Sequence, residues 1–417
     1  MNWRQSILTL GVMLSVGGAH AGPAGQAGSS KHNQLHKKSL HLANGASLVF
    51  KAENHQGMSV AENDILLGPA PQSDDGITSR GSGAAIISSR WPNGIIPFQF
   101  AADISNEDVL ARIREAVAHW NEHSSIRLVE RTKANQAIYE DYLEFTSSTG
   151  CASYVGRLGG RQEVWVSESC ASGSIVHELG HAIGLLHEHT RNDRDQHIVI
   201  NYDNIIPGKE HNYAIPSSNA DDLGPYDYGS IMHYGASFFS KNGGDTISPI
   251  ADITGIRMGQ RIALSEGDLQ AVDLLYATDL SLTVDTPETV EAGRPFNLSV
   301  NVTNLGELGA SEVLVVLPIS ADNQLTSFQG DGWSCEQQAA QIACGLAILS
   351  SADQRGLDLT INSSFEPPAS LDLNLSSRTA DSDLANNGKP LPADQQDTLD
   401  EFFTEPMLAE ANTSSTT

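Results

Sequence analysis

One short segment, from His177 to His187, restricts what this chain can be more than any other part of its sequence. It reads HELGHAIGLLH. Residues four apart share one face of an α-helix, so a helix here would direct His177 and His181 at the same metal ion. Gly184 allows a sharp turn after such a helix, which would bring His187 back as a third ligand. Three protein ligands leave one coordination position for water, the arrangement of a catalytic rather than a structural zinc site.

Glu178 directly follows the first of these histidines. From this place its carboxylate can take a proton from a metal-bound water without binding the metal itself. The alternative is a helix with surface histidines, which requires three His, one Glu and one Gly to fall into this register by chance. A second segment, SIMHY at Ser230–Tyr234, contains a Met and a Tyr that would ordinarily pack in a core. Because they follow a metal-binding pattern, we interpret the two segments as parts of one site.

The segments HELGHAIGLLHE (177–188) and SIMHY (230–234) together resemble the astacin family of metzincin zinc endopeptidases. The Glu after the third His and the Tyr after Met-His distinguish astacins from other metzincins, such as matrixins. Further similar segments lie at 91–98, 150–157 and 191–195. The resemblance covers residues 91–278. It implies an α+β fold, in which residues 84–278 form an astacin-like catalytic domain with a twisted sheet and a long active-site helix.

The resemblance also implies one Zn²⁺ per catalytic domain and a role for each matching residue. The implied metal ligands are His177, His181, His187 and, as a fifth ligand that leaves zinc to bind the tetrahedral intermediate, Tyr234. Glu178 would be the general base that activates the water and then protonates the leaving amine. Met232 would form an apolar floor below the metal, and Glu188 would bind the new N-terminal ammonium after activation. A protein substrate would add as an antiparallel strand to an edge strand near 162–167.

The first residues, 1–21, have the pattern of a signal peptide, with a positive start, a short apolar run and the cleavage pattern Ala-His-Ala. The apolar run is too short to cross a bilayer, so we expect a secreted protein, which can keep disulfides. The polar segment 22–83 is interpreted as a propeptide. Its activating cut would fall within 80–90, and Arg80 and the Gly83–Ala84 bond are both candidates.

Within this propeptide, the run from Glu62 to Ile65 resembles the family's aspartate switch, in which Asp64 would occupy the water position on zinc. Ala61 and Asn63 stand where the family usually has Phe and Gly. The alternative is an exposed aspartate in a loop.

The four cysteines divide between two parts of the chain. The resemblance implies a disulfide between Cys151 and Cys170, one of the two bridges usual in astacin catalytic domains. Neither partner of the other bridge is present, since Ser125 and the region of Thr278 stand at those places. Cys335 and Cys344 lie nine residues apart and would join two strands or a hairpin.

Beyond Thr278, short β-branched runs separated by turn signals predict an all-β Ig-like sandwich over 279–387. This part resembles, less specifically, the Ig-like and CARDB-like sandwich domains of bacterial exported proteins, and Val300 and Trp333 are expected in its core. Such a module could bind an extracellular surface or matrix ligand, space domains apart or be trimmed off, and fold analogy does not decide between these roles. The acidic, polar end at 388–417 is interpreted as a disordered tail.

Two helices are predicted from apolar spacing and capping residues. The first covers 105–122 with Ser105 as its N-cap, and the second covers 265–276 with Ser265 and Asp268 as a capping box.

The balance of 24 Lys and Arg against 51 Asp and Glu excludes a nucleic-acid binder, because phosphate contacts need clustered basic residues. We also expect no membrane span and a monomer. The sequence therefore predicts a secreted zinc-dependent endopeptidase, made as a zymogen, which hydrolyses peptide bonds of proteins by a zinc-activated water with Glu178 as general base. The alternative is an exported adhesive or matrix-binding protein with an inactive protease-like domain.

Overall fold

The structure is a computed structural model. It describes residues 35–41, 47–70, 90–216, 222–287, 293–319, 323–338, 341–363, 372–388 and 402–403. The predicted signal peptide at 1–21, the region of the activating cut at 80–89 and most of the predicted tail lie outside these residues.

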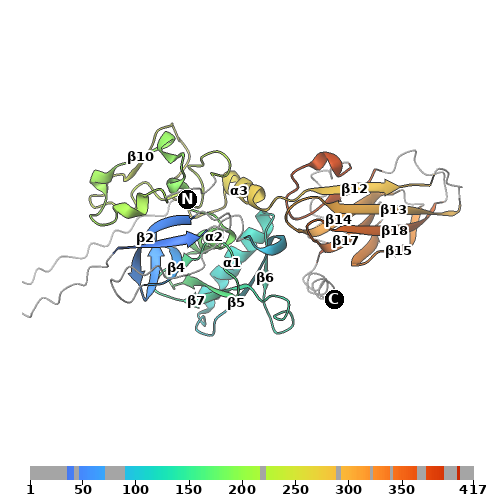
Figure 1. The fold of residues 1–417 in the computed structure, drawn as a ribbon, viewed down its shortest axis with the longest axis horizontal. Helices are drawn as coiled ribbons and strands as arrows, with labels where there is room; N and C mark the ends of the chain where they lie inside the picture. Colours follow the sequence, from blue (N-terminus) through green and yellow to red (C-terminus); the bar gives the residue numbers. More distant parts are fainter. Residues whose placement is uncertain are drawn as a thin grey trace, which may run out of the picture. The chain divides into compact units, whose positions relative to one another are not determined.

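A mixed sheet forms the centre of the part that contains the histidine motif (Figure 1). In residues 90–216 its strands are β5 (Ile95–Phe100), β6 (Arg127–Glu130), β7 (Tyr142–Ser147), β8 (Ala152–Ser153) and β9 (Arg161–Val166). Strands β6, β5, β7 and β9 are parallel neighbours, while β8 runs antiparallel to β9. Successive side chains of a strand point to opposite faces of the sheet. Ile96 and Phe98 of β5, Leu143 and Phe145 of β7 and Val164 of β9 are all buried in the hydrophobic core on one face of this sheet.

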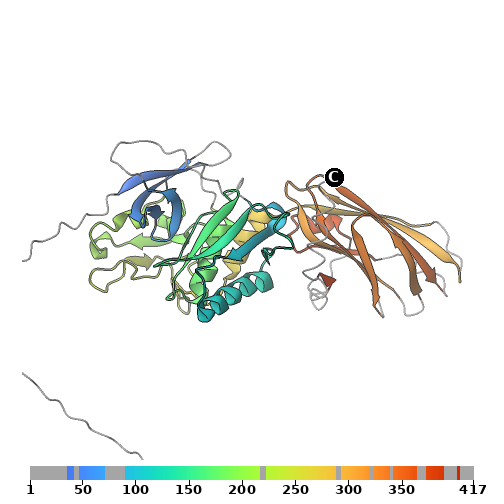
Figure 2. The same ribbon diagram turned by 90° about the horizontal axis from the view of Figure 1, so that it is seen from below.

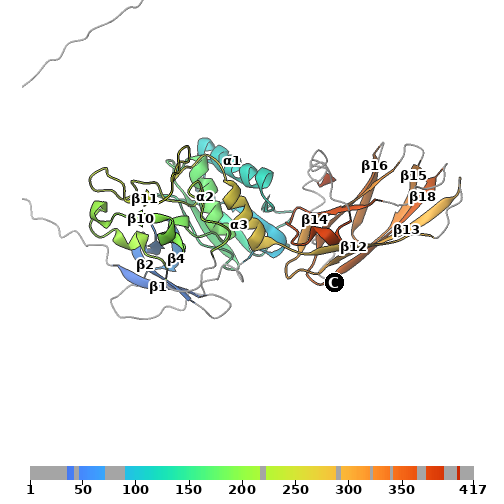
Figure 3. The same ribbon diagram turned by 90° about the horizontal axis from the view of Figure 1, so that it is seen from above.

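Three helices accompany this sheet: α1 (Glu107–His123), α2 (Ser172–Ile183) and α3 (Glu266–Tyr276). Figures 2 and 3 show α1 and α2 against each other beside the sheet. The Trp120 side chain of α1 is fully buried, and its indole N–H donates to the Val176 carbonyl of α2 at 3.0 Å. This contact fixes the histidine-bearing helix to the core.

The predicted N-terminal capping residue is wrong for α1, and the predicted capping box is confirmed for α3. The N-cap of α1 is Asn106, whose side chain accepts a hydrogen bond from the Asp108 N–H, so the prediction of Ser105 was wrong. Asn and Ser cap helices about equally well, and spacing alone did not distinguish two adjacent candidates. The capping box of Ser265 and Asp268 on α3 is confirmed.

Residues 36–69 form an antiparallel meander that continues the same sheet. Its strands are β1 (His36–His41), β2 (Ser47–His55), β3 (Met58–Ala61) and β4 (Ile65–Pro69). Strand β4 joins β8 through a parallel pairing of Ile65 with Ser153. The expected edge strand near 162–167 is not an edge, because β9 has β7 on one side and β8 on the other.

The remaining part of the histidine-containing region has short elements. They are strands β10 (Ile198–Ile200) and β11 (Ile247–Pro249), which pair with each other, and single 3₁₀ turns at Pro92–Gly94, Glu188–Thr190, Arg194–Gln196, Tyr202–Asn204 and Glu210–Tyr213.

The C-terminal part is an all-β sandwich of two antiparallel sheets, which confirms the predicted α+β fold with an all-β second domain. One sheet contains β12 (Leu280–Asp285), β13 (Pro295–Asn304), β18 (Gln354–Ser363) and β15 (Asn323–Gln329). The other contains β16 (Trp333–Gln338), β17 (Gln341–Leu349), β14 (Ala310–Pro318) and β19 (Asn374–Ser376). A 3₁₀ turn follows at Leu384–Asn386. Val300 and Trp333 lie in the shared core, as expected.

An unpredicted contact covers the outer face of the second sheet. Phe402 and Phe403 are buried against β14 and β17, in a cluster that includes Leu314 and Val316. A Cβ on Gly345 would lie 2.2 Å from the Phe402 ring, so a side chain at this position would exclude the ring.

Both predicted disulfides are present. Cys151 is bonded to Cys170, and Cys335 is bonded to Cys344. The second pair faces across β16 and β17, so it joins a hairpin. Among the described residues, no helix has both the length and the apolar character needed to cross a membrane.

Candidate metal centre

Helix α2 presents His177 and His181 from a buried position, since ten of its twelve residues are buried. The helix ends at Gly184, whose φ of 129° is rarely adopted by residues with a side chain. The chain then turns, and His187 comes back toward the first two histidines, as the spacing predicted. The three side chains are at most 2% exposed.

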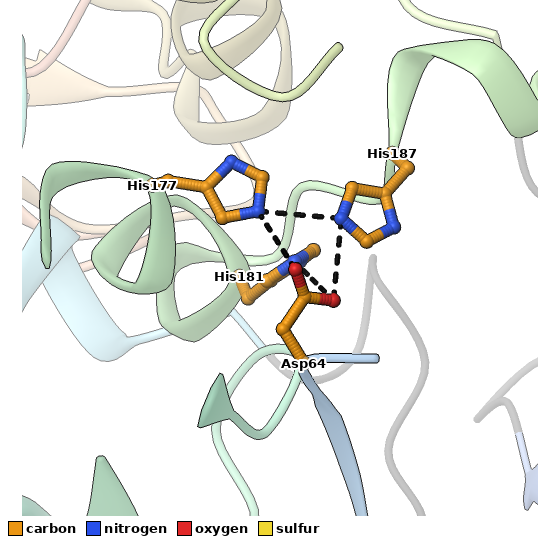
Figure 4. Close-up of side chains that lie close together, drawn as sticks. All are labelled: Asp64, His177, His181 and His187. Atoms are coloured by element: carbon orange, nitrogen blue, oxygen red, sulfur yellow. Dashed lines mark hydrogen bonds and ion pairs between the residues drawn. The ribbon is translucent and has the colours of Figure 1, made fainter. Parts of the chain in front are cut away.

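Figure 4 shows these histidines around the carboxylate of Asp64. The Nε2 atoms of His177, His181 and His187 lie 3.4, 3.8 and 3.3 Å from the nearest carboxylate oxygen of Asp64. One ligand atom from each of the four residues lies within 4.8 Å of all the others. The alternative of an exposed Asp64 does not hold in this structure, where Asp64 is 9% exposed.

The outer nitrogen of each ring has an acceptor of its own. The Nδ1 atoms of His177 and His181 lie 2.8 Å from the carbonyl oxygens of Ile231 and Leu185. The Nδ1 atom of His187 lies 2.7 Å from the Glu62 carboxylate. When Nδ1 donates its proton outward, Nε2 keeps its lone pair for a metal. All three rings are therefore oriented as metal ligands.

Several buried polar atoms at the centre have no hydrogen-bond partner. They are Oδ1 of Asp64, Nε2 of His181 and Oε2 of Glu178. Unpaired buried polar atoms cost about 1–3 kcal/mol each, and a cation among them would satisfy the lone pairs. Three imidazole nitrogens and one carboxylate oxygen form a donor set that suits Zn²⁺. The residues present fit a zinc ion.

The pKa values of the cluster reflect burial and the two carboxylates. Burial favours the neutral form of His187, but the nearby Asp64 and Glu62 outweigh this effect and raise its pKa to about 9. For His177, burial and the Arg261 guanidinium lower the pKa to about 4. Burial and the charge of Asp64 raise the pKa of Glu178 well above its usual range.

Tyr234 is buried beside His187, with their ring centroids 4.8 Å apart. Its hydroxyl donates a hydrogen bond to the backbone carbonyl of Glu62. The ring of His189 also stacks on the Tyr234 ring, with 3.8 Å between the ring centroids. Tyr234, the predicted fifth ligand, therefore lies close to the three histidines, but its hydroxyl is hydrogen-bonded to the segment that contains Asp64.

Met232 packs against α2 at Gly180. A Cβ on Gly180 would be 2.6 Å from the Met232 sulfur, so the glycine between the two helical histidines permits this approach. The turn that carries Met232 is held by Asp268, whose carboxylate accepts from the Ser230 hydroxyl at 2.6 Å and from the Ile231 N–H at 2.9 Å. The capping residue of α3 thus also orients the floor of the site.

Glu188 lines a pocket together with residues that include Gly184, His187, Arg191 and Leu223. Its carboxylate accepts from the Asp227 N–H at 2.7 Å. Burial raises its pKa to about 8, although the neighbouring Arg191 opposes this shift.

The sequence predicted no role in the site for Glu62, Asp268 or His189. Glu62 was noted only as a neighbour of Asp64 in the predicted switch motif, and Asp268 was expected only as a helix-capping residue. The sequence carries no signal of side-chain bonds between separate segments, such as those from Glu62 to His187, 125 positions apart, and from Asp268 to Ser230, 38 positions apart, so these contacts needed the structure.

The family model described as Astacin, a peptidase family, matches residues 84–277. Blastula protease 10 of Paracentrotus lividus is 41% identical over 218 residues, which are 49% of this chain and 36% of that protein. Bone morphogenetic protein 1 of Xenopus laevis is 42% identical over 194 residues, which are 45% of this chain and 27% of that protein. The chain thus spans well under half the length of these relatives.

Among solved structures, High choriolytic enzyme 1, a hatching enzyme zinc-protease from Oryzias latipes, shares 38% identity. The match covers 45% of this chain and 92% of that chain, with a TM-score of 0.40. The family match and the identity of these relatives confirm the resemblance inferred from the two motifs. Through residues 84–277, the chain belongs to the astacin family of peptidases.

Proposed function

We propose that the chain is a secreted zinc-dependent endopeptidase made as a zymogen. One observation carries this proposal: the Nε2 atoms of three buried histidines converge on one point, and each Nδ1 atom is hydrogen-bonded to an acceptor of its own. Beside them the Glu178 carboxylate is buried with one oxygen unpaired. An inactive, adhesive protein would not need this arrangement, so the alternative function is not favoured.

His177, His181 and His187 would hold the zinc. When bound, zinc supplies a Lewis acid that polarises a peptide carbonyl and lowers the pKa of water. Glu178 would accept the proton of the attacking water and then pass it to the leaving amine. A carboxylate can both take and return a proton in this way. The Tyr234 hydroxyl, once free of Glu62, would donate a hydrogen bond to the oxyanion.

The segment 35–70 would keep the enzyme latent. Asp64 lies among the three histidines, where a water would otherwise be needed, and β4 pairs with the short strand β8 beside the site. After the activating cut this segment would leave, and Glu188 would bind the new N-terminal ammonium in its pocket.

The sandwich at 279–387 would contact an extracellular surface or matrix ligand, and the protein would act as a monomer.

The test compares matured wild type with Glu178→Gln on a library of protein digests, and it reads new N-termini by mass spectrometry. The loss of Glu178 should reduce cleavage by about 10²–10⁴-fold while zinc content stays at one per chain. Glu122→Gln, at an exposed position on α1, is the matched control and should cleave as wild type does. Equal cleavage by wild type and Glu178→Gln would refute the mechanism.

A further inference from the structure

Glu62, two residues before Asp64, contacts two of the predicted metal ligands at once. Its carboxylate accepts a hydrogen bond from His187 Nδ1 at 2.7 Å. Its backbone carbonyl accepts the hydroxyl of Tyr234. The residue is 3% exposed, so the bond to His187 is shielded from water. A buried hydrogen bond to a charged acceptor is about twice as strong as a neutral one.

The backbone at this point is in an unusual conformation. Glu62 and Asn63 have φ values of 49° and 78°, within a turn closed by a hydrogen bond from Asp64 N to Ala61 O. Asn visits the left-handed region readily, whereas a glutamate there is uncommon. Strained residues of this kind persist where the surrounding structure holds them, and they cluster at functional sites. Here the strained residue is the one whose side chain and carbonyl reach into the site.

We propose that Glu62 is a positioning residue of the latent state, acting beside Asp64. This inference rests on the proposed zymogen function. The carboxylate orients the His187 ring and makes Nε2 a better donor to zinc, so the zymogen retains its metal more strongly than the mature enzyme does. The Glu62 carbonyl accepts the hydrogen bond of the Tyr234 hydroxyl, so the hydroxyl cannot donate to a substrate. The segment therefore restrains the site through three groups, which are the Asp64 carboxylate, the Glu62 carboxylate and the Glu62 carbonyl.

The test uses the full-length zymogen, purified before the activating cut. Glu62→Gln removes the negative charge and keeps the shape of the side chain. Glu53→Gln is the matched control, because Glu53 lies in the same segment and binds Lys209 at 2.7 and 2.8 Å instead of a histidine of the cluster. Zinc release to a chromogenic chelator is timed for each zymogen, and peptidase activity is measured before and after maturation.

We expect Glu62→Gln to speed zinc release from the zymogen by about tenfold or more and to raise the activity of the uncut zymogen. Glu53→Gln should release zinc at the wild-type rate. After the segment is removed, all three samples have the same mature sequence and should be identical. Wild-type rates in Glu62→Gln, or equal acceleration in Glu53→Gln, would overturn the inference.

The second contact has a separate readout. The amide of Ser153 donates to the Asp64 carbonyl at 2.9 Å, so its hydrogen exchange reports how firmly the segment is docked. Tyr234→Phe removes the donor to the Glu62 carbonyl and should speed this exchange in the zymogen by about two- to tenfold. Unchanged exchange would overturn the role given to the carbonyl.

These results separate the inference from the proposed function. A matured wild type without Glu178-dependent cleavage, but with zinc release that depends on Glu62, would refute the peptidase and keep the positioning role. A zymogen that binds no zinc would refute both.

Discussion

Replacing Asp268 tests how the third helix supports the metal centre. The Asp268 side chain accepts hydrogen bonds from Ser230 Oγ at 2.6 Å and from the backbone N–H groups of Ile231 and Ser265, both at 2.9 Å. The residue is 3% exposed, so water cannot replace these bonds. The Ile231 carbonyl in turn accepts from His177 Nδ1 at 2.8 Å. Asp268 is therefore connected to His177, a proposed zinc ligand, through a single residue, Ile231.

Asp268→Ala leaves the buried N–H of Ile231 and the part-buried N–H of Ser265 without an acceptor, at about 1–3 kcal/mol each. It also removes half of the capping box, which contributes about 1 kcal/mol. We expect the free energy of unfolding of the matured enzyme to fall by about 4 kcal/mol. Because the His177 acceptor would no longer be fixed, zinc affinity should fall by about 10–100-fold.

Asp268→Asn provides the matched comparison. The asparagine oxygen can still accept from both N–H groups, and its amide can donate to the Ser230 hydroxyl, which rotates to accept. We expect a loss of about 1 kcal/mol and zinc affinity close to wild type. Urea unfolding and competition with a chelator measure the two quantities.

Asp273→Ala serves as the control for general damage to α3. Its side chain accepts one hydrogen bond, from the Ser125 hydroxyl at 2.8 Å, and it has no bond to the Met232 turn. It should cost about 1 kcal/mol and leave zinc affinity unchanged. If Asp268→Ala unfolds more easily but binds zinc as wild type does, or if Asp273→Ala weakens zinc binding equally, the proposed connection from α3 to His177 is refuted.

Three further changes have expected outcomes. Gly180→Ala places a Cβ 2.6 Å from the Met232 sulfur and should lower the free energy of unfolding by about 1–3 kcal/mol, whereas an unchanged melting temperature would contradict the close packing. Replacing Cys335 and Cys344 together by Ser opens a short loop in the sandwich and should cost it about 3 kcal/mol in calorimetry, with peptidase activity of the matured protein retained. Phe402→Ala should cost about 3–5 kcal/mol and increase binding of a hydrophobic dye to the uncovered sheet face, and no change in either would refute that docking.

The parts of the fold that followed from the sequence depend on local spacing. His177 and His181 share a helix face because of the helical period, and the Ser265 capping box is contained within four residues. The alternating strands beyond Thr278 likewise fix which side chains face the sandwich core. In each case the pattern and the structure that it predicts lie in the same short stretch of chain.

The failures concern choices that local spacing does not make. Ser105 and Asn106 are adjacent and both good caps, and the structure uses the second. Whether β9 is an edge depends on where β8 pairs, which is a contact between two separate segments. The buried position of Phe402 depends on the space left by a glycine on a distant strand.

The turn at Asn63 shows how a departure from a motif can be read physically. The family usually has Gly at this position, and a positive φ is the conformation for which glycine is selected. Asn63 has a φ of 78°, in the region that Asn tolerates best among residues with a side chain. The replacement therefore keeps the turn that places Asp64 at the histidines. The same turn forces Glu62 into the left-handed region, where no such tolerance applies, and its bonds to His187 and Tyr234 are the interactions that can offset this cost.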